Sequence, residues 1–412
     1  MNLVVVCTNY PYLKGNAEYN LLNIQLNSFK NSFKNIFLLP TGRSKSEYPQ
    51  HKDKIFFNLR KPTGTFLFKF LIYFFGHIGF LIREIRSINR IKRLKKFKKS
   101  LFAYVKGIYL MVFLEYSLKK KGIHLSEVFI YSFWFDDYTL GALLFKLKHP
   151  TTKVITGAHG HDLYFERHPE KSIPFRYIAM ELIDHIIPDS KEGAQYLKYN
   201  FPLFKHKVSH LNSGVIQKSK KSKPSNDGIF RILTLSRTDP VKRIDYLLNT
   251  LKKLEDLLEF EIQYFHIGDG EELDELKKQS KCLKFEKFKI MFLGNLKDND
   301  LKVFFENKPI DVFLNVSSSE GTSMALIEAL SYAIPSVVTN VGGNKIIGSY
   351  CKTMLPLNFT PDDLLEYFKK IHYDSSYRDQ LSKQSYSYWL NNHDANGIHN
   401  EINKIFKETA KS

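Results

Sequence analysis

The sequence has little cysteine, and its few cysteines follow no pattern that binds a metal. Only Cys7, Cys282 and Cys351 occur among 412 residues, and their spacing matches neither a zinc site nor a disulfide framework. Such a chain fits a reducing cytoplasm. No basic segment or small-residue cleavage site precedes the first apolar strand, L-V-V-V-C after Asn2, so no signal peptide is expected.

No apolar run is long enough to make a clear membrane span. The most apolar one, residues 66–82, has 17 residues and contains Lys69, His77 and two glycines, which makes it marginal as a span. Residues 83–99 follow with nine basic side chains and one acidic one. Apolar residues recur there near the helical period, at Ile85, Ile88, Ile91 and Leu94.

We call residues 66–105 the arm. A basic amphipathic helix beside an aromatic-rich one is typical of a segment that lies in an anionic membrane surface. The alternative is a pair of ordinary domain helices with a solvated charged face.

Acidic residues are scarce in the first half only. Residues 1–213 hold 33 Lys and Arg against 15 Asp and Glu, whereas basic and acidic residues nearly balance in residues 214–412. The net charge of the whole chain is +19. An anionic partner is therefore expected to meet the first half. Nucleic acid is not expected, because no stacking platform or nucleic-acid-binding module accompanies the charge.

The length of 412 residues predicts two domains, and the regular alternation of apolar strands with amphipathic helices excludes disorder. We expect a first domain at 1–213, a polar linker at 214–228 and a second domain at 229–388. Residues 389–412 are left as a C-terminal helix.

The stretch from Asn315 to Gly343 carries the strongest functional signal. It reads as a strand at 312–316, a loop, a helix at 323–332, a strand at 336–339 and a diglycine turn. Ligands collect where the strand ends and the helix begins, because free backbone N–H groups and the helix dipole favour anions there. Gly321 would let backbone approach a ligand closely.

Two carboxylates, Glu320 and Glu328, flank the start of this helix. Ionised carboxylates only accept hydrogen bonds, so such a pair suits a ligand with vicinal hydroxyls. Spacing alone favours the alternative that Glu320 is a solvated loop acid and Glu328 a surface helix residue.

The stretch S-S-E-G-T-S-M-A-L-I-E-A, followed by I-P and V-G-G, resembles the donor-site signature of glycosyltransferase family 4. That family is retaining and has the GT-B fold, two doubly wound Rossmann-like domains that face each other across a cleft. The chain looks most like bacterial transferases that build exopolysaccharide, capsule or O-antigen. The resemblance implies that Glu320 contacts the donor sugar and Glu328 the nucleotide ribose. One departure is Ile346, where the family usually has Glu.

The resemblance extends to a basic turn after residues 230–235. Arg237 and Lys242 flank a proline before a helix, where Arg can act as a bidentate fork and Lys as a point charge. The family places such a pair on the donor diphosphate, although exposed loop cations are the plain alternative. Further donor contacts are implied for Gly294, Asn295, Thr322 and Ser323.

In the first domain the resemblance rests on spaced turns. G-A-H-G-H-D places His159 directly after a strand, where similar transferases have a His that lines the reaction centre. Asp162, Gly15 and Asn16 are weaker candidates for the acceptor side. In this fold the terminal helix crosses back to the first domain, as residues from about 389 are expected to do.

We therefore expect a metal-independent, retaining glycosyltransferase of the hexosyltransferase type. Its expected catalytic residues are His159, Arg237, Lys242 and Glu320. No cofactor or metal is expected, and D-N-D at 298–300 is interpreted as a helix start. The expected partners are a nucleotide sugar, a saccharide acceptor that is lipid-linked, and the inner face of the cytoplasmic membrane. A nucleotide-sugar epimerase and a non-catalytic membrane-surface scaffold are the alternatives.

Overall fold

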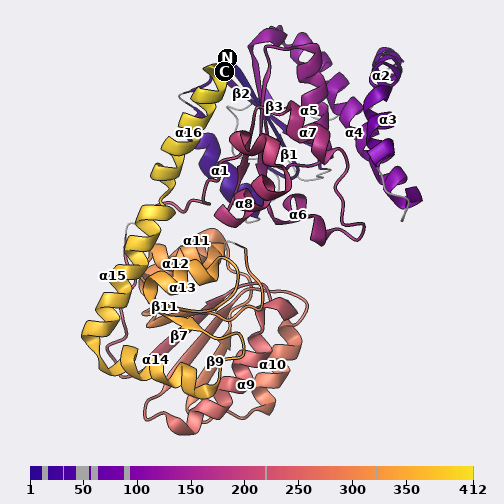
Figure 1. The fold of residues 1–412 in the computed structure, drawn as a ribbon. Helices are drawn as coiled ribbons and strands as arrows, with labels where there is room; N and C mark the ends of the chain where they lie inside the picture. Colours follow the sequence, from indigo (N-terminus) through magenta and orange to yellow (C-terminus); the bar gives the residue numbers. More distant parts are fainter. Residues whose placement is uncertain are drawn as a thin grey trace. The chain divides into compact units, whose positions relative to one another are not determined.

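The computed structural model describes residues 1–11, 17–30, 32–42, 55–56, 64–87, 93–218, 220–321 and 323–411 (Figure 1). The chain forms two compact units. The first unit contains Met1–Asn212 and His399–Ser412, and the second contains Ser213–Ile398.

The first unit is built on a parallel sheet of order β3-β2-β1-β4-β5-β6. Its strands are β1 (Asn2–Cys7), β2 (Asn35–Pro40), β3 (Ile55–Phe56), β4 (Val128–Ser132), β5 (Lys153–Ala158) and β6 (His185–Pro188). The central strands are buried along their length, as the continuous apolar runs require of parallel strands covered on both faces. The strand order reverses between β1 and β4, which makes their carboxyl ends the natural ligand crevice.

Helices cover both faces of this sheet. They are α1 (Ala17–Phe29), α5 (Asp137–Lys148), α6 (Gly160–Leu163), α7 (Arg176–Leu182) and α8 (Lys191–Asn200). Asp136 is the N-cap of α5, since its side chain accepts a hydrogen bond from Tyr138 N at 2.9 Å. Burial, with the nearby charge of Asp137, raises the pKa of Asp136 to about 7.

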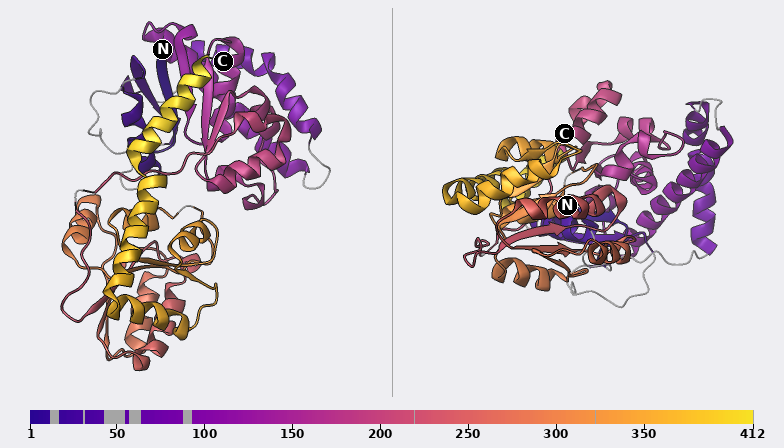
Figure 2. Two further views of the ribbon diagram at one scale, coloured as in Figure 1. Left: turned by 60° about the vertical axis from the view of Figure 1, so that its left-hand side comes forward. Right: turned by 90° about the horizontal axis from the view of Figure 1, so that it is seen from below.

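The described part of the arm contains α2 (Gly64–Gly76), α3 (Ile78–Ser87) and the start of α4 (Arg93–Lys120). They lie side by side at the margin of the first unit (Figures 1 and 2). Helix α4 packs closely on α5, since a Cβ at Gly141 would lie only 2.6 Å from the carbonyl oxygen of Gly107. Large apolar side chains remain exposed on this margin: Leu67, Phe68, Leu71, Ile72, Phe75, Ile82, Leu94 and Phe102.

Among the described residues, only α4 is by itself long and apolar enough to cross a membrane, and 67% of its apolar stretch is buried within the protein. Helices α2 and α3 reach that length only as a pair, and they are bent by 47°. The basic positions Arg90 and Lys92 lie outside the described residues.

The second unit repeats the architecture with a parallel sheet of order β12-β11-β10-β7-β8-β9. Its strands are β7 (Phe230–Leu235), β8 (Ile262–Ile267), β9 (Phe288–Phe292), β10 (Val312–Asn315), β11 (Ser336–Thr339) and β12 (Met354–Leu355). Its helices are α9 (Ile244–Leu254), α10 (Leu273–Cys282), α11 (Asp298–Asn307), α12 (Met324–Ser331), α13 (Asn344–Cys351), α14 (Pro361–Tyr373) and α15 (Ser375–Asn392). The predicted doubly wound α/β class is confirmed.

The last helix, α16 (Ala395–Lys411), begins in the second unit and continues into the first from His399. Phe406 anchors its end, since its ring lies 4.6 Å from that of Phe29 and 5.0 Å from that of Phe129 between centroids. Trp389 is fully buried in the core of the second unit. The segment grouped with the first unit therefore starts at His399, ten residues later than the expected start at 389.

Candidate functional site

The strand order of the second unit reverses between β7 and β10, and the strongest sequence candidates gather at this point. A small cavity of about 10 Å³ is lined by the ends of both strands and by Lys242: Thr234, Leu235, Ser236, Lys242, Ile244, Leu314, Asn315, Val316 and Ser317. The carboxyl ends of two strands at such a switch point form the usual ligand crevice of an open α/β sheet.

Glu320 is held at this crevice by three side chains. Lys242 Nζ lies 2.6 Å from Glu320 Oε1 in an ion pair, although the two residues are 78 positions apart. Ser317 Oγ donates to the same oxygen at 2.8 Å, and Asn315 Nδ2 does so at 3.4 Å. The carboxylate keeps only 10% of its side-chain surface exposed. The structure thus brings Lys242 and Glu320 together as one charged pair.

The loop that carries Glu320 leads directly into a capped helix. Ser323 is the N-cap of α12, its Oγ accepting from Leu326 N at 3.4 Å and from Asn315 Nδ2 at 2.9 Å. Asn315 therefore links the end of β10 both to Glu320 and to the first turn of α12. The strand–loop–helix unit predicted at 312–332 is present, with β10 one residue shorter than predicted.

The diglycine turn, Gly342 and Gly343, packs against the loop that carries Glu320. Gly342 has φ +42°, and a Cβ there would lie 1.8 Å from the carbonyl oxygen of Glu320. Gly343 N donates to Gly321 O at 3.2 Å. A Cβ at Gly321 itself would meet no atom within 4 Å. Gly342 is thus required by the packing of the loop, whereas Gly321 leaves space beside it.

Glu328 pairs with a residue of the expected linker. Lys218 Nζ lies 2.6 Å from Glu328 Oε1, and both side chains are largely buried. Lys218 Nζ also lies 5.2 Å from the ring centroid of Tyr332, a residue about one helical turn after Glu328. Sequence reasoning missed Lys218, because a lysine in a polar, Lys-rich linker carries no local signal.

The other donor-side candidates are more exposed. The side chain of Arg237 is 79% exposed and pairs with Asp239 at 2.5 Å. Gly294 has φ +66° and accepts a hydrogen bond from Gly268 N at 2.8 Å, and the next residue, Asn295, is exposed. Arg237 and Asn295 are therefore not fixed by packing as Lys242 and Glu320 are. Thr322 lies outside the described residues.

In the first unit, His159 follows β5 and is only 8% exposed. Its Nδ1 lies 3.1 Å from Asp189 Oδ2, and its Nε2 lies 3.2 Å from Phe133 O. Its ring stacks on that of Phe133 with centroids 4.4 Å apart. Because both ring nitrogens face acceptors, the doubly protonated imidazolium satisfies both contacts.

The electrostatics of this site favour that charged form. Burial alone would lower the pKa of His159, but the hydrogen bond and charge of Asp189, together with Asp162, raise the pKa above its ordinary value. Asp189 was missed by sequence reasoning, although its place after β6, beside β5 in the sheet, is a usable signal.

Asp162 organises backbone rather than presenting a free carboxylate. One oxygen accepts from His159 N at 2.7 Å and the other from Phe135 N at 2.6 Å. Glu18 does the same for the loop after β1, accepting from three successive backbone N–H groups and from Trp134 Nε1 at 3.0 Å. The predicted acceptor-side residues Gly15 and Asn16 lie outside the described residues.

No group of three or more His, Cys, Asp or Glu side chains within the described parts of the chain is placed to hold a metal ion. Asp298 and Asp300 lie in the first turn of α11, in agreement with their interpretation as a helix start.

Residues 215–388 match the sequence model of the family described as Glycosyl transferases group 1. This segment, which we call the group 1 domain after that match, lies in the second unit. Over 170 residues the chain is 32% identical to the O-antigen biosynthesis glycosyltransferase WbnH of Escherichia coli, and equally to the probable O-antigen biosynthesis glycosyltransferase WbiN of the same organism. Each match covers 40% of this chain and 44% of the relative, so the chain spans less than half the length of these curated relatives.

Solved structures resemble the whole chain, not the group 1 domain alone. The apo form of the lipopolysaccharide outer core galactosyltransferase WaaB has a TM-score of 0.68 at 15% identity, over 99% of this chain and 100% of that one. Anabaena Alr3699/HepE in complex with UDP has a TM-score of 0.65 at 14% identity, again over 99% and 100%. At such identities the likeness shows the fold, which is GT-B.

Proposed function

We propose that this protein is a retaining, metal-independent glycosyltransferase that moves a sugar from a nucleotide sugar to a saccharide acceptor in O-antigen or lipopolysaccharide synthesis. The observation that carries the proposal is the Lys242–Glu320 pair at the carboxyl ends of β7 and β10, inside a group 1 domain. The O-antigen relatives and the UDP bound to a protein of the same fold support it.

The donor side follows from the chemistry of the second unit. Sugar transfer builds negative charge on the departing diphosphate, which Lys242, Arg237 and the N-terminus of α12 are suited to stabilise. Glu320 and Glu328 offer carboxylate oxygens to sugar and ribose hydroxyls. Glu320 pairs with Lys242 and Glu328 with Lys218, and donor hydroxyls and phosphates would replace part of each pair.

The acceptor side is assigned to the first unit. His159, held by Asp189 and Phe133, would contribute positive charge rather than remove a proton, because both of its ring nitrogens face acceptors and Asp189 raises its pKa. The acceptor hydroxyl then gives its proton to the leaving phosphate. Such a front-face route needs no covalent nucleophile from the protein and is consistent with retention.

We assign the arm to an anionic membrane surface at the inner face of the cytoplasmic membrane, with a lipid-linked acceptor. Exposed apolar side chains on α2 lie beside the basic start of α4, and this combination suits a helix margin that meets headgroups.

The proposal is tested by incubating the purified protein with nucleotide sugars and a chelator, with and without a lipid-linked saccharide. We expect acceptor-dependent release of nucleotide and a product whose anomeric configuration, read by NMR, equals that of the donor. An epimerised donor formed without acceptor would replace the proposal with an epimerase. Absence of any donor binding or turnover would identify a non-catalytic scaffold.

A further inference from the structure

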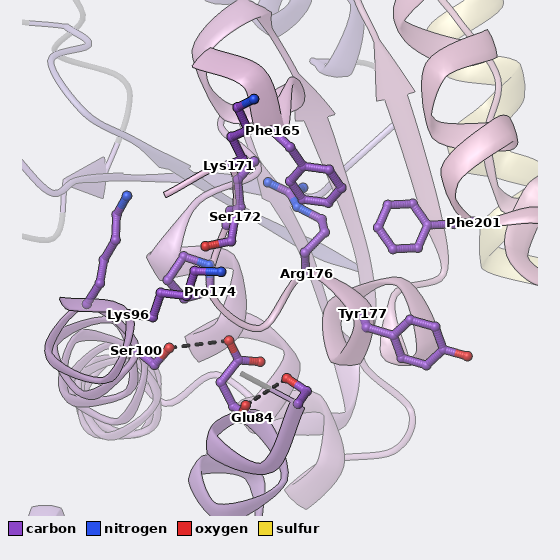
Figure 3. A pocket seen from close by; sticks show the side chains of 13 residues that line it. Glu84, Lys96, Ser100, Phe165, Lys171, Ser172, Pro174, Arg176, Tyr177 and Phe201 are labelled. Atoms are coloured by element: carbon purple, nitrogen blue, oxygen red, sulfur yellow. Dashed lines mark hydrogen bonds between the residues drawn. The ribbon is translucent and has the colours of Figure 1, made fainter. Parts of the chain in front are cut away.

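A cavity of about 230 Å³ lies in the first unit between α3, α4 and the segment at 165–177 (Figure 3). It is lined by Glu84, Ser87, Lys96, Lys99, Ser100, Phe165, Lys171, Ser172, Ile173, Pro174, Arg176, Tyr177 and Phe201. A cavity of only about 10–15 Å³ is enough to hold a single water molecule. The cavity therefore has room for a group of several heavy atoms, and none of its lining residues is among the candidate site residues described around Glu320 and His159.

Arg176, one of the lining residues, has buried donors without partners among the described residues. Only 4% of its surface is exposed, and the guanidinium carbon lies 3.5 Å from the ring centroid of Phe135. Its Nη2 donates to Phe135 O at 2.8 Å and to Asp162 O at 2.5 Å. Its Nε and Nη1 have no hydrogen-bond partner among the described residues. Buried charged donors left unpaired are costly, so the site is incomplete without an acceptor.

Three lysines add positive charge around the same cavity. Lys99 binds Glu170 at 3.1 Å, whereas Lys96 and Lys171 have no ion-pair partner among the described residues. The only acid in the lining is Glu84, whose carboxylate accepts from Ser100 Oγ at 3.3 Å. Burial raises the pKa of Glu84, which favours its neutral form. The cavity thus carries a net positive charge.

The remaining lining is apolar and aromatic. Phe165, Tyr177 and Phe201 form one wall, with ring centroids of neighbouring pairs 6.1 and 6.3 Å apart. Helix α3 lines the cavity and continues from α2, whose apolar side chains are exposed. A ligand that fits this setting combines an anionic group with an apolar part.

We propose that this cavity binds the phosphate or diphosphate head group of an amphiphile, namely the lipid-linked acceptor. The assignment of the amphiphile as acceptor rests on the proposed function. Phosphate oxygens would accept from Arg176, and Lys96 and Lys171 would contribute as point charges. The cavity would hold the lipid end of the acceptor, at a site distinct from the donor diphosphate.

The test is calorimetric titration with inorganic pyrophosphate and with farnesyl diphosphate. All proteins carry Lys242→Ala, so that binding at the donor diphosphate site is weakened. The test variant adds Lys96→Gln and Lys171→Gln. The matched control adds Lys98→Gln and Lys120→Gln, which remove the same charge from exposed positions of α4 outside the cavity. Equal melting temperatures of the three proteins establish that each is folded.

We expect the test variant to bind farnesyl diphosphate about tenfold more weakly or worse, and the control to bind as the parent does. Farnesyl diphosphate should bind more tightly than pyrophosphate. Equal affinity of the test variant and the control would overturn the site. Equal affinity for the two probes would overturn the lipid assignment in favour of free diphosphate.

Nucleotide-sugar binding, measured in the same variants with Lys242 restored, separates this inference from the proposed function. The cavity variant should bind the nucleotide sugar as wild type does. If wild type fails to bind any nucleotide sugar, the proposed function fails, while the diphosphate titration still decides the cavity.

Discussion

At the scale of single residues, the second unit presents two lysine–carboxylate pairs, Lys242–Glu320 and Lys218–Glu328, each at 2.6 Å. Their burial differs from that of Arg237, which is largely solvated. A solvated ion pair contributes little to stability. We therefore propose that the two largely buried pairs recognise the donor in positions set by the fold. We propose that Arg237 becomes ordered only when it binds a phosphate group of the donor.

Replacing Glu328 by Ala should weaken nucleotide-sugar binding while leaving the fold intact. Losing hydrogen bonds to a charged group costs ~1.5–3 kcal/mol, or roughly 10 to 150-fold in affinity. Calorimetric titration measures this directly, and Glu275→Ala, an exposed acid on α10, is the matched control. A folded Glu328 variant with wild-type affinity would remove this residue from the donor site.

Asp189→Asn should lower the pKa of His159. The variant loses the negative charge that raises this pKa, whereas the burial that lowers it remains. NMR titration of the imidazole measures this shift. His185, whose pKa burial lowers to about 4, is an internal reference that should not move. An unchanged His159 pKa in the variant would show that Asp189 does not control its charge.

The raised pKa of His159 also links pH to the stability of the first unit. The stabilisation is complete below the unfolded pKa of about 6.5 and is lost as pH rises through the higher folded pKa. This loss should be smaller in the Asp189→Asn protein, in chemical denaturation followed across that pH range.

At the scale of elements, local sequence signals located the strand–helix–strand unit well, whereas long-range pairings escaped them. The apolar runs and the N-cap residue Ser323 predicted bounds for β10, α12 and β11 that lie close to those in the structure. The contact of Lys218 with Glu328 depends on tertiary packing across 110 positions, which no local pattern encodes. Asp189 and His159 meet for the same reason, through neighbouring strands.

The arm shows the same limit. Its helical character was predicted, but not the break between α2 and α3 after Gly76. Trp389 was expected to start the crossing helix, yet its size and apolarity place it in the core of the second unit.

Gly342→Ala should disrupt the loop that carries Glu320. The new Cβ would lie 1.8 Å from Glu320 O, and φ +42° is itself unfavourable for alanine. We expect a lower melting temperature and lost donor binding, measured by thermal denaturation with and without nucleotide sugar. Gly321→Ala, whose Cβ meets open space, should keep the wild-type melting temperature without ligand. Equal stability of both variants would show that the loop does not need Gly342.

At the scale of the whole molecule, charge is distributed unequally, with nearly all of the net +19 in residues 1–213. A soluble acceptor would explain neither this asymmetry nor the exposed apolar side chains of α2. Both features follow if the first unit works against an anionic surface.

The protein should sediment with anionic liposomes, and replacing Arg90, Lys92, Arg93, Lys95 and Lys96 by Gln should sharply reduce this. Each basic residue near an anionic leaflet contributes ~1 kcal/mol, and added salt should weaken binding. The control replaces five exposed lysines of the second unit, Lys253, Lys278, Lys281, Lys289 and Lys297. Equal sedimentation of both variants, or no sedimentation of the wild type, would show that the arm is a pair of ordinary helices with a solvated charged face.

We propose that the group 1 domain binds a nucleotide sugar at Lys242 and Glu320 without a metal. Thermal denaturation of the protein with a panel of nucleotide sugars, in the presence of a chelator, tests it most directly. Binding stabilises the native state by ~2.7 kcal/mol at a hundredfold excess over the dissociation constant. We expect one nucleotide sugar to raise the melting temperature of wild type and of Lys289→Ala, but not of Lys242→Ala. No shift with any nucleotide sugar, or an equal shift in all three proteins, would contradict the account.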